Sequence, residues 1–138
     1  MRDDSGELAL IVADTDVLID FLRGRGAAER VALELKQGLA TTVISAFELW
    51  AGSIGSTKRE KAVAVLLDAL AIITLDASAA KQAAALRHSL QKKGRTIGMA
   101  DSLIAGICID RSAILLTRNT KHFGDIPRLS LGTLSDEG

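Results

Sequence analysis

Leu8-Ala9-Leu10-Ile11-Val12-Ala13-Asp14 is an unbroken apolar run that ends abruptly on a carboxylate. Its length and its terminating charge favour a short strand that is buried on both faces. The same pattern predicts further short strands over residues 39–42, 71–75 and 113–117. Strands that are apolar throughout are typical of a parallel sheet with helices packed on both of its faces.

Helical stretches alternate with these strands along the whole chain. Apolar spacing and capping residues predict a helix opening at Ser45 and helices over residues 17–22, 27–37, 57–70, 77–92 and 100–110. Residues 126–131 are predicted to add an edge strand, because Pro127 near their start is tolerated there. This alternation predicts an α/β fold with three α/β/α layers around a central, mostly parallel sheet.

The composition is that of a globular protein. The 138 residues are 48% hydrophobic and 25% charged with zero formal net charge, so no global basic excess attracts polyanions. The one cysteine, Cys108, excludes an intramolecular disulfide and a multi-cysteine zinc site, and we expect it to be buried. The sequence shows no bilayer-spanning run and no signal peptide, which predicts a cytoplasmic protein without membrane association. We expect a flexible extension at residues 1–7 and a single domain over residues 8–134.

Acidic residues fall next to the ends of the predicted strands. Asp14 ends the first strand, and Asp16 lies two residues further on. Glu48 and Asp101 each lie in the first turn of a predicted helix, and Asn119 follows the last buried strand. Because sites in parallel sheets form outside the carboxyl ends of the strands, we expect these side chains to converge on one cleft.

A cluster of carboxylates needs a compensating charge, because like charges raise one another's pKa. Mg²⁺, or Mn²⁺ as an alternative, binds oxygen ligands and commonly combines a few carboxylates with water and phosphate. An ion held in this way suits phosphodiester hydrolysis, since it activates water and stabilises the charge that develops on phosphate.

The same residues also have purely structural interpretations. Ser45 and Glu48 have the spacing of a capping box, and Asp101 suits the dipole of a first helical turn. We expect Asp16 to cap the helix after the first strand. Asp14 is harder to explain structurally, because an unpaired charge at the end of a buried strand is expensive.

The aromatic and histidine side chains give weaker signals. Aromatic residues make up only 3% of the chain, which argues against an aromatic platform that stacks on bases. We expect Phe47 and Trp50 to lie in the core, and His88 and His122 to lie on the surface.

Four segments carry a more specific pattern, namely residues 11–19, 45–52, 98–105 and 115–123. They contain an apolar strand followed by Asp-Thr-Asp, then Ser-x-x-Glu-x-x-x-Gly, then a helix start with a third acid, and finally Thr-x-Asn-x-x-x-Phe. In this order they resemble a PIN-domain ribonuclease, and more closely a VapC-type toxin of a bacterial toxin–antitoxin pair. The resemblance covers the chain from Leu10 to about Leu131 and implies a PIN-like fold.

The resemblance also implies roles for the acidic residues. Asp14, Glu48 and Asp101 match the family's acidic metal ligands and, with Asn119, form the expected catalytic set. Asn119 stands where many members carry a fourth acid, so a second metal site is left open. Asp125 is a possible substitute, but its spacing does not fit the pattern.

Other polar residues are implied as supporting groups. Thr15, Asp16 and Thr117 are candidates to hydrogen-bond water or phosphate at the site. Basic residues within 23–25, 58–61 and 92–95 are candidates for a surface that contacts RNA, although such groups are usually only solvated.

The function implied by the resemblance is that of a Mg²⁺-dependent endoribonuclease. It would act as the toxin of a type II toxin–antitoxin pair, cleave tRNA or ribosomal RNA, and inhibit translation. The implied partners are a cognate VapB-like antitoxin, a second copy of the chain in a homodimer, and operator DNA reached only through the antitoxin.

Other interpretations of the same residues remain open. A degenerate PIN domain would bind RNA or a partner protein without cutting. A haloacid dehalogenase-like phosphatase would use Asp14 of the Asp-Thr-Asp-Val-Leu stretch as nucleophile, but the required late acidic pair is missing. A response-regulator receiver fits the chain length but not the placement of its phosphoacceptor.

Overall fold

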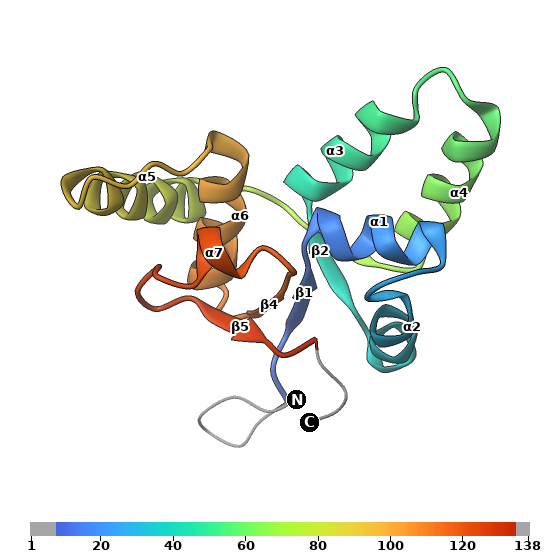
Figure 1. The fold of residues 1–138 in the computed structure, drawn as a ribbon, viewed down its shortest axis with the longest axis horizontal. Helices are drawn as coiled ribbons and strands as arrows, with labels where there is room; N and C mark the ends of the chain where they lie inside the picture. Colours follow the sequence, from blue (N-terminus) through green and yellow to red (C-terminus); the bar gives the residue numbers. More distant parts are fainter. Residues whose placement is uncertain (1–7, 135–138) are drawn as a thin grey trace.

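The computed structural model describes residues 8–134, so the predicted flexible extension at residues 1–7 lies outside the described residues (Figure 1). Strands and helices alternate as predicted. In chain order the elements are β1 (Ile11–Ala13), α1 (Thr15–Arg23), α2 (Ala28–Gln37), β2 (Ala40–Thr42), α3 (Val43–Ser53), α4 (Thr57–Asp68), β3 (Ala71–Ile73), α5 (Ala77–Lys92), α6 (Met99–Asp110), β4 (Ile114–Leu116), α7 (Thr120–Phe123) and β5 (Ser130–Gly132).

Within the described residues, the five strands form one sheet in the order β3-β2-β1-β4-β5, and every neighbouring pair is parallel. In the middle of the sheet, Val12 of β1 lies opposite Ala40 of β2 and Leu115 of β4. The predicted edge strand exists, but it begins at Ser130 rather than at residue 126. Because β1 lies between β2 and β4, Asp14 follows a strand that has neighbouring strands on both sides.

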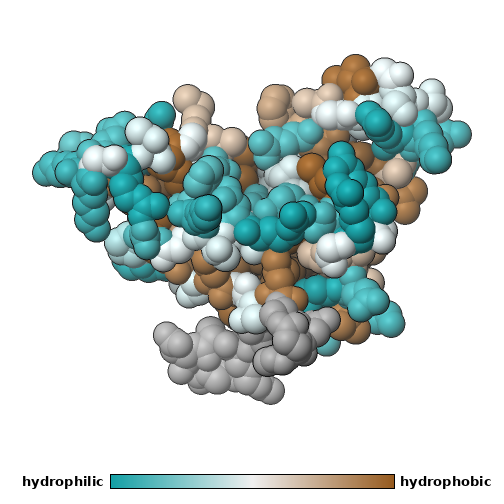
Figure 2. All heavy atoms as spheres, viewed as in Figure 1, coloured by the Kyte–Doolittle hydropathy of each residue, from teal (hydrophilic) through white to brown (hydrophobic). Residues whose placement is uncertain are grey.

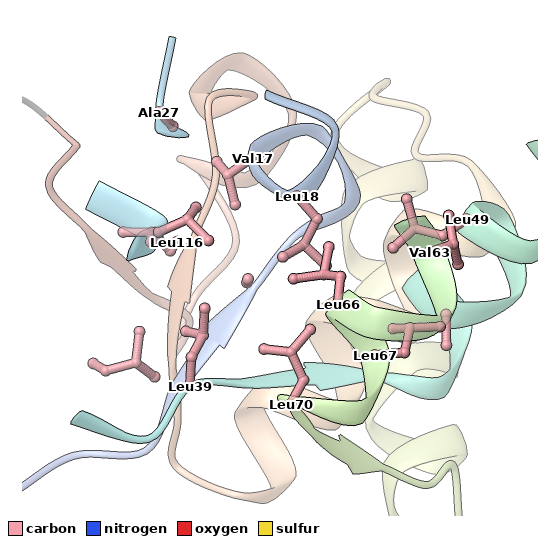
Figure 3. Close-up of a cluster of buried hydrophobic side chains, with 14 of the residues drawn as sticks. Val17, Leu18, Ala27, Leu39, Leu49, Val63, Leu66, Leu67, Leu70 and Leu116 are labelled. Atoms are coloured by element: carbon pink, nitrogen blue, oxygen red, sulfur yellow. The ribbon is translucent and has the colours of Figure 1, made fainter. Parts of the chain in front are cut away.

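Two apolar clusters lie on opposite faces of the sheet. Ile11 and Ala13 of β1 join the cluster that α1, α2, α3 and α4 complete, which Figure 3 shows around Leu18, Leu66 and Leu116. Val12, which points the other way, joins the cluster completed by α5, α6 and α7. Residues on a strand alternate between faces, so these two clusters confirm the predicted α/β/α layers.

The second cluster depends on a close approach of α5 and α6. Gly106 of α6 has no side chain, and a Cβ placed there would lie 2.6 Å from the carbonyl oxygen of Ala79 and 2.8 Å from the Cβ of Ala83. Cys108 on the same helix is fully buried, as expected, and burial raises the pKa of its thiol to about 12. This thiol is therefore a packing group rather than a reactive one.

One predicted helix start is wrong. Thr42 has an extended backbone (φ −95°, ψ 158°) and its hydroxyl accepts from the Ser45 N–H, so α3 begins at Val43 instead of Ser45. Ser56 caps α4 in the same way through the Arg59 N–H, and α4 begins at Thr57 as predicted. In each case a neighbouring hydroxyl residue occupies the capping position.

Phe47 and Trp50 are not in the core, contrary to the prediction. Their exposed fractions are 66% and 48%, and Ile54 beyond them is 77% exposed, while Ala46 and Leu49 of the same helix are buried. Figure 2 shows apolar atoms at the surface over the α3–α4 end of the molecule. The helix packs one side on its neighbours and leaves the other side uncovered.

Among residues 8–134, no helix is both long and apolar enough to cross a membrane.

Candidate active site

Asp14 links the end of β1 to the start of α1. It is the N-cap of α1, and its Oδ1 accepts from the Thr15 N–H at 2.8 Å. Its Oδ2 accepts from the Thr117 hydroxyl at 2.8 Å, which ties it to the residue after β4. The prediction that Asp16 caps this helix is wrong, because the extended backbone needed for a cap occurs at Asp14.

Asp14 is only 5% exposed, and burial raises its pKa to about 6. The charge of Asp16 is the next cause of this higher pKa, and the charge of Asp101 adds to it. Hydrogen bonds from Thr117 and Thr15 act in the opposite direction. The structure therefore brings Asp14, Asp16 and Asp101 into one electrostatic group, although Asp101 comes from a distant helix.

Asp16 adds a second carboxylate at this edge of the sheet. Its Oδ2 accepts from the Arg118 N–H at 3.0 Å, whereas its Oδ1 is buried without a hydrogen-bond partner. Burial also raises the pKa of this carboxyl. A buried carboxylate oxygen without a donor is unusual, and a cation is one partner that would satisfy it.

Glu48 reaches the same junction from α3. Its Oε1 accepts from the Thr15 hydroxyl at 2.5 Å, and the Thr15 Oγ1 also lies 2.9 Å from the Ser45 Oγ. The capping-box interpretation of Ser45 and Glu48 is therefore wrong, since Thr42 caps α3 and Glu48 turns toward α1. Glu48 is oriented by a residue directly beside Asp14.

Asp101, Asn119 and His122 form a further group. Asp101 lies in the first turn of α6, and its Oδ2 is 3.5 Å from the Nδ1 of His122. The same Nδ1 is 3.0 Å from the amide nitrogen of Asn119. His122 is 61% exposed, so its predicted surface position is confirmed, but its contact with Asp101 was missed. The signal in the sequence that could have pointed to His122 was its spacing of three residues from Asn119.

Sequence reasoning also missed an ion pair between the buried Asp20 and the half-exposed Arg118. Asp20 in α1 is 2% exposed, and its two carboxylate oxygens accept from one guanidinium nitrogen of Arg118 at 2.8 and 2.9 Å. Asp20 also accepts from the Ala27 N–H at 3.0 Å. The pair anchors the segment that carries Thr117 and Asn119. The position of Asp20 within the otherwise apolar stretch of residues 17–22 was the signal that pointed to it.

The carboxylates are of the right chemical type to bind a hard divalent cation, since all the predicted ligands are oxygen donors. The side chains as they stand do not form a complete cage, because residues 8–134 contain no group of three or more His, Cys, Asp or Glu placed to hold a metal. Glu48 instead contacts Thr15. Asp125, the possible substitute acid, pairs with Arg95 and is exposed.

An apolar depression of about 450 Å³ lies away from these acids. It is lined by residues of α1 and α4, including Phe21, Leu22, Val65 and Leu66. Phe21 and Leu22 belong to the last turns of α1, at the end opposite Asp14. The depression is therefore a separate surface feature.

Comparison with known proteins agrees with this geometry. Residues 11–129 match the family model of the PIN domain. The tRNA(fMet)-specific endonuclease VapC of Shigella flexneri is 30% identical over 114 residues, covering 80% of this chain and 86% of that protein. The chain belongs to the VapC ribonucleases of the PIN-domain family. Ribonuclease VapC2 of Rickettsia felis, another VapC protein, is 32% identical over 128 residues, covering 88% of this chain and 96% of that one.

Solved VapC structures have the same fold. In the crystal structure of VapBC2 from Rickettsia felis bound to a promoter DNA fragment, the matching chain has a TM-score of 0.80 and 28% identity, with 89% of this chain and 97% of that chain covered. VapBC-1 from nontypeable Haemophilus influenzae gives a TM-score of 0.78 at 26% identity, with 91% and 98% covered. The predicted PIN-like α/β fold is confirmed.

Proposed function

We propose that this VapC-type nuclease is a Mg²⁺-dependent endoribonuclease that acts as the toxin of a type II toxin–antitoxin pair. The observation that carries the proposal is the crowding of carboxylates around Asp14 at the end of β1. Asp14 is buried, its pKa is raised toward neutrality, and the neighbouring Asp16 has a carboxylate oxygen without a donor. If these residues only maintained the fold, replacing their buried charges by apolar groups would make the protein more stable.

In this proposal Asp14, Glu48 and Asp101 would hold the ion, which when bound would activate water and neutralise charge on the phosphodiester. The Thr117 hydroxyl and the Thr15 N–H fix the two oxygens of Asp14. The Thr15 hydroxyl holds Glu48 near the same junction. These contacts orient the carboxylates before RNA binds, which lowers the cost of organising the transition state.

The proposed substrate is cellular RNA, either tRNA or ribosomal RNA, and its cleavage inhibits translation. The Shigella flexneri relative is named for a tRNA substrate, which supports this class. The proposed partner is a VapB-like antitoxin, supported by solved relatives that are toxin–antitoxin complexes. Operator DNA would be reached only through that antitoxin. We propose a homodimer as the working form, since α3 exposes Phe47, Trp50 and Ile54.

The test is cleavage of total cellular RNA by the purified, antitoxin-free chain with Mg²⁺ and with EDTA, beside Asp101→Asn. We expect discrete fragments that require both Mg²⁺ and Asp101. Asp110→Asn is the matched control, because Asp110 ends the same helix and contacts Ser78 rather than the site. Absence of cleavage by a folded wild-type chain, with RNA binding retained, would favour a domain that binds without cutting.

A further inference from the structure

We propose that His122 is a metal ligand of this site and that its imidazole shifts the preferred ion from Mg²⁺ to Mn²⁺. The inference rests on the proposed function, because it specifies which ion the same site uses. It adds a nitrogen donor to a site that the acidic residues alone define as an oxygen site.

The argument begins with the spacing of the donor atoms. The Nδ1 of His122 lies 3.5 Å from the Oδ2 of Asp101 and 3.0 Å from the amide nitrogen of Asn119. Neighbouring donors on one octahedral ion lie about 3 Å apart, because each is about 2.1 Å from the ion. Rotation of the Asn119 amide would present its carbonyl oxygen in place of its nitrogen. The Nδ1 of His122 thus lies close to the spacing of a neighbouring ligand from both Asp101 and Asn119.

The second step is the position of His122 in the chain. Asn119 directly precedes α7, and His122 lies in that helix, so one turn brings both side chains toward Asp101 on α6. The Asn119 N–H donates to the Thr117 hydroxyl, and the Arg118 N–H donates to Asp16. The segment that carries His122 is therefore fixed to the acidic group by its own backbone.

The third step is the charge of the site. Asn119 brings no negative charge, whereas the charges of Asp16 and Asp101 already act against ionisation of Asp14. A neutral imidazole adds a donor without adding to that repulsion. The 61% exposure of His122 leaves its ring accessible to an ion arriving from solvent.

The nature of this donor determines the preferred ion. Mg²⁺ is bound mainly through oxygen, while imidazole suits first-row transition metals. A site with Asp101, Asn119 and His122 should therefore bind Mn²⁺ more tightly, relative to Mg²⁺, than the same site without the imidazole.

The experiment is pulsed electron paramagnetic resonance of Mn²⁺ bound to the full chain, purified without a histidine tag. A directly bound imidazole gives a nitrogen coupling that carboxylates do not give. The chain has only two histidines, so His88→Ala on the exposed face of α5 is the matched control. We expect His122→Ala to lose the nitrogen coupling and to weaken Mn²⁺ binding about tenfold. We expect His88→Ala to change neither.

A second variant keeps a ligand at the position but changes its type. His122→Asp should retain ion binding without nitrogen coupling and should lower the preference for Mn²⁺ over Mg²⁺ in calorimetric titrations. Equal Mn²⁺ binding by the wild type and His122→Ala, with no nitrogen coupling in either, would overturn the inference. In that case loss of binding in Asp101→Asn would leave the proposed function standing. A wild-type chain that binds neither ion would overturn both.

Discussion

Asp14 combines a helix cap with a negative charge that is nearly excluded from solvent. Its pKa of about 6, against an ordinary value of 3.8, means that ionisation costs more in the folded chain than in the unfolded chain. This cost is absent below about pH 4 and fully present above about pH 6. The metal-free protein should therefore lose stability as the pH rises through that window. A cation at the site would recover part of the loss.

Replacing Asp14 by Asn should stabilise the metal-free chain at high pH. In EDTA at pH 8 we expect the free energy of unfolding to rise by about 2 kcal/mol, because the buried charge is removed while the amide still hydrogen-bonds. At pH 4 the difference should vanish, since Asp14 is then protonated when folded. Urea denaturation at both pH values measures the effect, with Asp125→Asn as an exposed control. A destabilised Asp14→Asn at pH 8 would contradict this account.

The partly buried ion pair of Asp20 and Arg118 should contribute more to stability than an exposed pair. Arg118→Met leaves Asp20 buried without its cation, so we expect a loss of about 2 kcal/mol. Arg95→Met removes the exposed pair with Asp125 and should cost less than about 1 kcal/mol. Denaturant unfolding at pH 7 compares the two variants. Equal losses would mean that Asp20 finds another partner when Arg118 is removed.

At the scale of elements, the contact between α5 and α6 fixes the start of α6 and therefore Asp101. The absence of a side chain at Gly106 allows the two helices to approach so closely that a Cβ there would lie 2.6 Å from the Ala79 carbonyl oxygen. An added methyl group would meet backbone rather than a flexible side chain, so the helices must separate.

We accordingly expect Gly106→Ala to lower the free energy of unfolding by about 2 kcal/mol, although alanine is the better helix former. Gly52→Ala is the matched control, because Gly52 lies in α3 and a Cβ there meets nothing within 4 Å. That control should gain about 0.5 kcal/mol. Thermal unfolding of both variants measures the difference. Stabilisation of both would show that α5 and α6 can move apart without cost.

At the scale of the whole molecule, the uncovered side of α3 bears on assembly. Trp50 is the only tryptophan and is half exposed beside Phe47. If the homodimer forms through this side, Trp50→Glu should weaken self-association about tenfold or more, because a charge enters an apolar contact. Sedimentation velocity over a concentration series measures this. Leu33→Glu on α2, 52% exposed, is the control and should leave association unchanged.

The sequence alone determined the alternation of elements, the parallel sheet and the placement of acids after the strands, because these follow from local periodicity and chain order. It also determined that Asp14 needs a special explanation. Only the tertiary structure decided that Glu48 contacts Thr15 and that His122 contacts Asp101. It likewise decided that α3 leaves Trp50 uncovered. These features depend on how helices pack across long sequence separations, where the same residue pattern is compatible with a cap, a core position or a site.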